Sequence, residues 1–138
     1  MNRDRLVARF IRLENEERFV YPDNRTYWTI GIGRCVDKRV GEGLSHEECL
    51  YLLNNDINNR VTALRASLSW FDSLDDNRQE VLMDMAFQMG TGGLLGFHHF
   101  LAHLKDGQYG EAAKDLLDSE YAKEDPGRAQ ENASLIRG

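Results

Sequence analysis

Glu14 is the residue whose type fits its surroundings least. Residues 3–14 are predicted to form a helix, because four apolar residues recur there at helical spacing: Leu6, Val7, Phe10 and Ile11. At about 100° per residue, Glu14 falls within that apolar stripe. A carboxylate on an apolar face costs several kcal/mol unless it is paired or protonated. The alternative is that the helix ends a turn earlier and Glu14 is solvated.

A second carboxylate and a hydroxyl follow Glu14 within a predicted β-hairpin over residues 18–34. Asp23 lies in the turn former Pro22-Asp23-Asn24-Arg25, and Thr29 lies in the second apolar run. Each has an ordinary structural explanation, since Asp is common in turns and Thr favours strands. Taken singly, neither residue indicates a function.

The rest of the chain is predicted to be helical. Ser45 and Glu48 form a capping box that opens a long amphipathic helix through Leu64, after a loop at Gly41-Glu42-Gly43. Asp75 can cap a helix that stops at Gly90, and Gly92-Gly93 is expected to break helical structure. Three short helices are expected at residues 97–105, 111–117 and 128–136.

The composition favours one globular domain and excludes several classes of partner. The 138 residues carry a net charge of −6, with 11 basic and 10 acidic side chains in residues 1–69 and 6 and 13 in residues 70–138. Without a basic stripe, nucleic acid and stable membrane association are not expected. No apolar run is long enough for a signal peptide or a membrane span.

Cysteine and histidine usage gives no sign of a metal site. Cys35 and Cys49 are expected to be free thiols. His99 and His103 are four residues apart on a predicted helix, next to His98, and this spacing can bind metal. No acidic residue or cysteine stands at a recognised offset, so we expect solvated histidines and no metal.

Considered together, the residues match a family pattern. Glu14, Asp23 and Thr29 at these spacings, with the segment Thr29-Ile30-Gly31-Ile32-Gly33, resemble the phage-type muramidases. Further matches follow in the same order, among them Phe71-Asp72-Ser73-Leu74-Asp75, Phe87-Gln88-Met89-Gly90 and Pro126-Gly127-Arg128-Ala129. The resemblance covers the chain from about Ile11 to its end.

The resemblance implies an α+β, mostly helical, lysozyme-like fold with two lobes. It implies a single domain over residues 1–138, with a β-hairpin lobe at about 12–44, a bridging helix at 45–66 and a helical lobe at 67–138. No cofactor is expected. The implied substrate is the glycan strand of peptidoglycan, cleaved at the β-1,4 bond between N-acetylmuramic acid and N-acetylglucosamine.

The resemblance also implies a role for each residue of the motif. Glu14 would be the general acid, Asp23 would act as base or electrostatic partner to the attacking water, and Thr29 would hold that water. Glycoside hydrolysis needs one protonated and one ionised carboxyl, and inversion needs room for water between them. Arg128 matches an arginine that pairs with the catalytic Glu, although by itself it would be an ordinary residue at a helix start.

Several other positions correspond to substrate contacts or differ from the family pattern. Phe87 and Gln88 match positions that line the cleft, although the spacing alone would place Phe87 in the core. Relatives have other residues at three expected sugar contacts, which are Cys35, Phe100 and Asp115 here. Arg34 stands where relatives commonly have His. It could pair with Asp56, or both side chains could be solvated. Asn15 stands where a Gly usually follows the catalytic Glu.

The biological role implied is that of a phage or prophage endolysin. Such a protein would be a monomer in the host cytoplasm and would reach the periplasmic wall by a separate export or holin route. An antibacterial toxin, a tail-associated muramidase and a non-catalytic peptidoglycan-binding module are the alternatives. Retention of Glu14, Asp23 and Thr29 together argues against the binding module.

Overall fold

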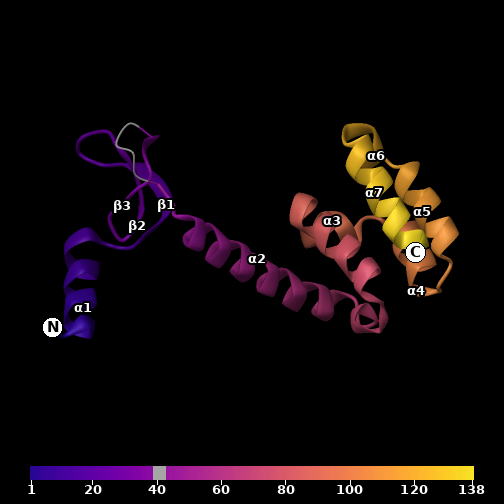
Figure 1. Cartoon of the computed structure of the whole chain (residues 1–138), viewed down its shortest axis with the longest axis horizontal. Helices are drawn as coiled ribbons and strands as arrows, with labels where there is room; N and C mark the ends of the chain where they lie inside the picture. Colours follow the sequence, from indigo (N-terminus) through magenta and orange to yellow (C-terminus); the bar gives the residue numbers. More distant parts are fainter. Residues whose placement is uncertain (39–42) are drawn as a thin grey trace. The chain divides into compact units, whose positions relative to one another are not determined.

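The computed structural model describes residues 1–38 and 43–138, and its contacts divide the chain into two units, Met1–Leu52 and Leu53–Gly138 (Figure 1). The mostly helical α+β class is confirmed, with a small antiparallel sheet in the first unit and helices predominating in the second. Gly41 and Glu42 of the expected loop lie outside the described residues.

The first unit contains helix α1 and the sheet. Helix α1 covers Arg3–Glu14 and begins at Asn2, whose Oδ1 accepts a hydrogen bond from Arg5 N at 2.9 Å. Three strands follow in the order β1-β2-β3, with antiparallel pairing: β1 Glu17–Pro22, β2 Trp28–Gly31 and β3 Arg34–Cys35. The predicted hairpin is therefore confirmed, and the third strand is an addition to it.

Three of the four arginines of helix α1 lie on one side of it. Arg5, Arg9 and Arg12, at spacings of four and three residues, line one shallow hollow around Ala8. The expectation that the chain has no basic stripe is therefore wrong for this helix. The apolar residues Val7, Phe10 and Ile11 of α1 are exposed as well.

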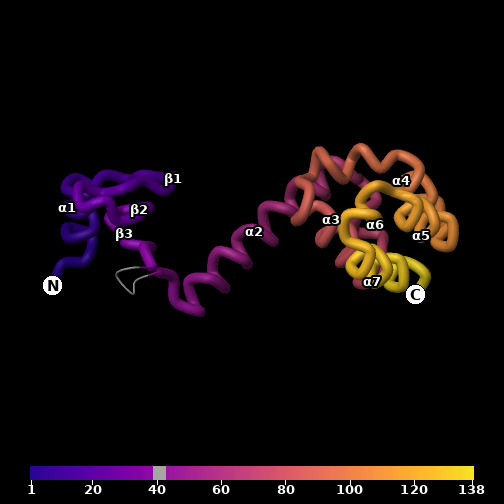
Figure 2. Tube along the Cα trace, turned by 90° about the horizontal axis from the view of Figure 1, so that it is seen from above, coloured from indigo at the N-terminus to yellow at the C-terminus, as the bar shows by residue number. Residues whose placement is uncertain are grey.

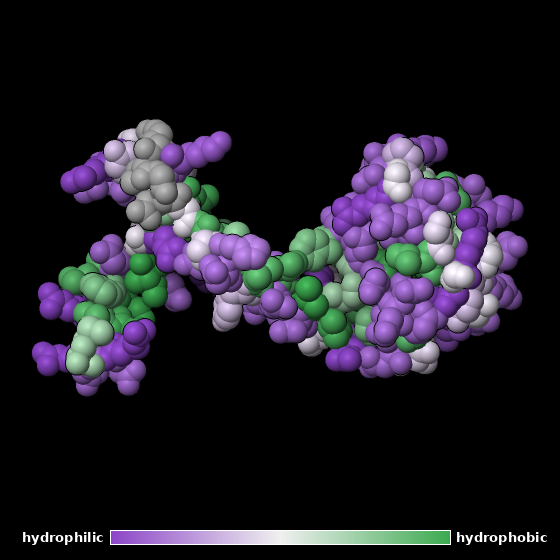
Figure 3. All heavy atoms as spheres, viewed as in Figure 1, coloured by the Kyte–Doolittle hydropathy of each residue, from purple (hydrophilic) through white to green (hydrophobic). Residues whose placement is uncertain are grey.

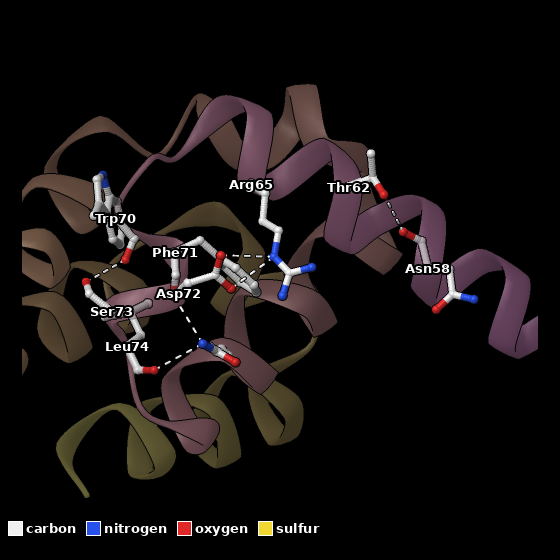
Figure 4. Close-up of polar contacts among 9 residues, drawn as sticks. Asn58, Thr62, Arg65, Trp70, Phe71, Asp72, Ser73 and Leu74 are labelled. Atoms are coloured by element: carbon white, nitrogen blue, oxygen red, sulfur yellow. Dashed lines mark hydrogen bonds and ion pairs between the residues drawn. The ribbon is translucent and has the colours of Figure 1, made fainter.

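Helix α2, His46–Ser67, begins in the first unit and ends in the second. Its predicted capping box is confirmed, because Glu48 N donates to Ser45 Oγ at 3.1 Å and Ser45 N donates to Glu48 Oε2 at 2.8 Å. At its other end, Arg65 Nε contacts both carboxylate oxygens of Asp72 in the 3₁₀ helix Phe71–Ser73 (Figure 4).

The helical unit is built around one apolar core. After α2 come α3 Asp76–Leu95, α4 His98–Lys105, α5 Tyr109–Leu117, α6 Glu120–Glu124 and α7 Pro126–Arg137. Helix α7 packs against α3, α5 and α6, and the last two lie beside it in Figure 2. The largest fully buried side chains include Leu64, Leu82, Met85, Phe100, Leu104, Leu116 and Ile136. The face of this unit seen in Figure 3 is mostly hydrophilic, as expected over such a core.

Helix α3 corrects two predictions about its glycines. Gly90 does interrupt the helix, with φ 79° and ψ 160°, but helical structure resumes and continues to Leu95. Gly92 and Gly93 therefore lie inside a helical segment instead of breaking one. Helix α6, capped by Ser119, was not predicted. Among the described residues, no helix is long and apolar enough to span a membrane.

Candidate active site

Glu14 is the last residue of α1, and its carboxyl lies against the turn between β2 and β3. Of the two alternatives that the sequence left open, the solvated one is found, because the side chain is exposed, although the helix does not end a turn early. A Cβ atom placed on Gly33 would lie 2.9 Å from Glu14 Oε2. Asn15 follows with φ 61° and ψ 166°, a conformation that costs least for Gly, which gives a physical reason for the Gly usual at this position.

Asp23 lies in the turn between β1 and β2 and is bound there by hydrogen bonds to the backbone. Its Oδ1 accepts hydrogen bonds from Arg25 N at 2.8 Å and Tyr27 N at 2.9 Å, and its own N–H donates to Tyr27 O at 2.8 Å. The expected turn chemistry is thus present. Within the described ranges, no hydrogen bond to Oδ2 is found, so this oxygen can accept a proton or orient a water molecule.

Thr29 lies in the central strand and is 4 % exposed. Its Oγ1 donates to Tyr27 O at 3.1 Å, and its backbone pairs with Tyr21 on one side and with Cys35 on the other. Directly paired residues of neighbouring strands have Cβ atoms about 5 Å apart. The sheet thus brings together two of the residues that the sequence singled out, Thr29 and Cys35.

Asp37 was missed by the sequence analysis. It is a buried acid whose Oδ2 accepts a hydrogen bond from Trp28 N at 3.0 Å, and it thereby holds the start of the strand that carries Thr29. No spacing or motif distinguishes it in the sequence, because its partner is a backbone group nine residues away.

Arg34 is bound to a different acidic residue from the one expected. Its Nη1 lies 2.6 and 2.7 Å from the two carboxylate oxygens of Glu48, in the first turn of α2. Hydrogen bonds from Ser45 N and then from Arg34 lower the pKa of Glu48. Asp56 lies further along α2, in the second unit, and its pairing with Arg34 stays a prediction.

In the helical unit, Phe87 and Gln88 are both exposed on α3. The core placement that spacing suggested for Phe87 is therefore wrong. Gln88 lines a hollow of about 430 Å³ together with the aromatic side chains of Phe97 and Tyr121. Phe100 is only 1 % exposed and packs edge to face against Phe97, so it offers no surface with which to contact a sugar.

Asp115 faces a histidine. Its Oδ2 lies 2.6 Å from Nδ1 of His103, and both side chains are partly buried between α4 and α5. This acidic neighbour was not indicated by the sequence, because it lies 12 residues further along the chain. Within residues 1–38 and 43–138, no cluster of three or more metal-ligating side chains is found.

Arg128 lies in a polar network of the helical unit. Its Nε is 3.0 Å from both carboxylate oxygens of Asp84, its Nη2 also contacts Asp84, and Asn132 Nδ2 donates to Asp84 at 2.8 Å. Burial raises the pKa of Asp84, but the hydrogen bonds from Arg128 and Asn132 outweigh it and lower that pKa overall. The pairing of Arg128 with Glu14 stays a prediction.

Comparison with known proteins places the chain in a family. The family model described as phage lysozyme matches residues 12–135. The Dictyostelium discoideum protein named "Probable T4-type lysozyme 1" is 24 % identical over 89 % of this chain and 88 % of its own length. A second protein of that organism, "Probable T4-type lysozyme 2", is 25 % identical over the same shares.

A third relative is much longer than this chain. The pre-baseplate central spike protein Gp5 of Enterobacteria phage T4 is 27 % identical over 94 % of this chain but only 27 % of its own length. The family match covers most of the chain and includes Glu14 at the end of α1 and the hairpin with Asp23 and Thr29. The chain belongs to the phage lysozyme family.

Proposed function

We propose that this protein is a muramidase that hydrolyses the β-1,4 bond between N-acetylmuramic acid and N-acetylglucosamine in peptidoglycan. Family membership supports lysozyme activity. The observation that carries the assignment comes from the first unit. There the carboxyl of Glu14, at the end of α1, lies against the turn that follows the strand bearing Thr29. Asp23 supplies a second carboxylate from the opposite end of that strand.

The proposed chemistry divides the work between the two carboxyl groups. Glu14 protonates the glycosidic oxygen as the bond to the leaving sugar breaks, and the anomeric carbon becomes oxocarbenium-like. Asp23 uses its open Oδ2 to take a proton from the attacking water, while Oδ1 stays bound to two backbone N–H groups. Attack from the face opposite the leaving group gives inversion at the anomeric carbon.

Residues of the helical unit are proposed to contact the sugars. Gln88 offers an amide donor and acceptor for N-acetyl groups, and the exposed ring of Phe87 offers an apolar surface for their methyl groups. The hollow beside Gln88 contains two aromatic residues and carboxylates of α6, a mixture that suits a polar ligand with apolar faces.

The proposed biological role is host-cell lysis as a phage or prophage endolysin. A tail-associated muramidase is the second candidate, because the chain is 27 % identical to part of a phage spike protein. An antibacterial toxin is a further alternative. In each role the partner is the peptidoglycan glycan strand, and the genes that flank this one would distinguish the roles.

Replacement of Glu14 tests the proposed activity. Glu14→Gln keeps the shape of the side chain but removes the transferable proton, so turnover should fall by about 10²–10⁴-fold. Because the side chain is exposed, the free energy of unfolding should change by less than about 0.5 kcal/mol. The assay is loss of turbidity of chloroform-permeabilised Gram-negative cells, with the products identified by mass spectrometry.

Glu16→Gln is the matched control, since it makes the same change two residues later at another exposed position. It should lyse cells at a rate close to that of the wild-type protein. Near-normal lysis by a folded Glu14→Gln variant would refute the role of Glu14 as the acid.

A further inference from the structure

Gly33 is in unusually close contact with the proposed catalytic acid. An ideal Cβ atom on Gly33 would lie 2.9 Å from Oε2, 3.0 Å from Cδ and 3.1 Å from Cγ of Glu14. Separations of this size are below ordinary carbon–oxygen and carbon–carbon contact distances. The end of the Glu14 side chain therefore occupies the space that any other residue at position 33 would need.

Gly31 lies two residues earlier. Its comparison with Gly33 distinguishes a need for left-handed backbone geometry from a need for space. Both glycines have φ +70°, a left-handed conformation that disfavours residues with a Cβ. A Cβ on Gly31, however, would meet nothing within 4 Å. Left-handed geometry explains a glycine at both positions, but only at Gly33 does the missing side chain make room for another group.

We propose that Gly33 is a positioning residue for Glu14. This proposal rests on the proposed role of Glu14 as the general acid. The bare backbone of Gly33 forms a surface on which the carboxyl lies, and this contact limits the orientations that the side chain can adopt. Glu14 is exposed, and the contact described for its carboxyl end is the one with Gly33. A general acid must lie within hydrogen-bond reach of the oxygen that it protonates, and a misplacement of about 1 Å can cost about 10²-fold in rate.

The pair Gly33→Ala and Gly31→Ala tests the proposal by steady-state kinetics on soluble peptidoglycan fragments. Gly33→Ala should lower kcat by about 10²-fold with little change in KM, because the acid moves while the sugar contacts stay in place. Gly31→Ala carries the same φ and should keep kcat within a few-fold of wild type. Equal losses of kcat in the two variants would overturn the proposal.

A second measurement tests the contact without relying on activity. Thermal unfolding midpoints are compared for Gly33→Ala in the wild-type background and in a Glu14→Ala background. The added methyl group should lower the midpoint more when Glu14 is present, because the clash needs the Glu14 side chain. An equal shift in both backgrounds would overturn the proposal.

The two measurements separate this proposal from the proposed function. If Gly33→Ala does not fold but the double variant does, the contact is confirmed. A wild-type protein with no hydrolase activity would refute the proposed function and, with it, a catalytic purpose for the contact. An active wild-type protein whose Gly33→Ala and Gly31→Ala variants behave alike would refute the positioning role alone.

Discussion

In two arginine–aspartate pairs of the helical unit, the arginine Nε lies close to both carboxylate oxygens, but their surroundings differ and only Arg128 adds a contact through Nη2. Arg128 Nε lies 3.0 Å from both oxygens of Asp84, and Arg65 Nε lies 2.9 and 3.0 Å from both oxygens of Asp72 (Figure 4). The side chains of Arg128 and Asp84 are 40 % and 26 % exposed, whereas those of Arg65 and Asp72 are 57 % and 60 % exposed. Asp84 also accepts a hydrogen bond from the buried Asn132.

These surroundings predict unequal effects of the same substitution. Asp84→Asn should lower the free energy of unfolding by about 1–3 kcal/mol, because partly buried donors lose a charged acceptor. Asp72→Asn should cost less than about 1 kcal/mol, as is usual for exposed pairs. Urea unfolding at pH 7 measures both, and equal losses would show that burial does not strengthen the Asp84 pair.

The lowered pKa of Asp84 also predicts a dependence on pH. A carboxyl whose pKa is lower in the folded state contributes stability above its unfolded pKa of about 3.9, and that contribution is lost as the pH falls through the folded value. The difference in stability between wild type and Asp84→Asn should therefore persist at pH 7 and shrink in acid. A difference that stays constant down to about pH 2 would contradict this interpretation.

For single residues, the sequence indicated the members of the motif but not the residues that they contact. Glu14, Asp23 and Thr29 were identifiable because their types and spacing are local properties. The partners of Arg34 and Arg128 were not, since Glu48 and Asp84 are 14 and 44 residues away along the chain. Only folding decides which of many exposed carboxylates an arginine meets.

Secondary-structure elements were predictable where their patterns were long. The hairpin and the start of α2 follow from turn residues and a capping box, both of which act within a few residues. Strand β3 has 2 residues and α6 has 5, too few to show a period. The continuation of α3 beyond Gly90 was missed because glycine is the strongest local signal of a helix end, and here packing overrides it.

The glycines of α3 give a test of this element. Gly92 lies in a helical segment with nothing within 4 Å of an added Cβ, so Gly92→Ala should stabilise the protein by about 0.5–1 kcal/mol. Gly90 also has open space, but its φ of 79° should make Gly90→Ala destabilising by about 1–2 kcal/mol. Thermal unfolding of the two variants should therefore shift in opposite directions, and a Gly90→Ala protein as stable as wild type would contradict the kink.

Charge is distributed unevenly over the whole molecule. Residues 1–52 carry 9 basic and 9 acidic side chains, and residues 53–138 carry 8 and 14, so the net charge of −6 belongs to the helical unit. The first unit is neutral, but Arg5, Arg9 and Arg12 share one face of α1. A negatively charged enzyme gains no long-range attraction to an anionic wall.

Lysis of permeabilised cells should therefore stay constant or rise as ionic strength increases from about 10 to about 150 mM, because salt screens the repulsion. The measurement is the initial rate of turbidity loss at a fixed pH. A steep fall over that range would contradict the prediction and would indicate that the arginine face of α1 dominates the encounter. In that case, replacing the three arginines by glutamine should abolish the salt dependence.

The division of the chain into two units has a consequence for optical spectroscopy. The protein contains 2 tryptophans, and each unit has one: Trp28 begins β2, and Trp70 packs at the edge of the helical core. The tryptophan fluorescence of a Trp70→Phe protein therefore comes only from the first unit, and that of a Trp28→Phe protein only from the helical unit. Superimposable denaturation curves from the two would mean that the units melt as one cooperative body, and separate midpoints would mean that each melts by itself.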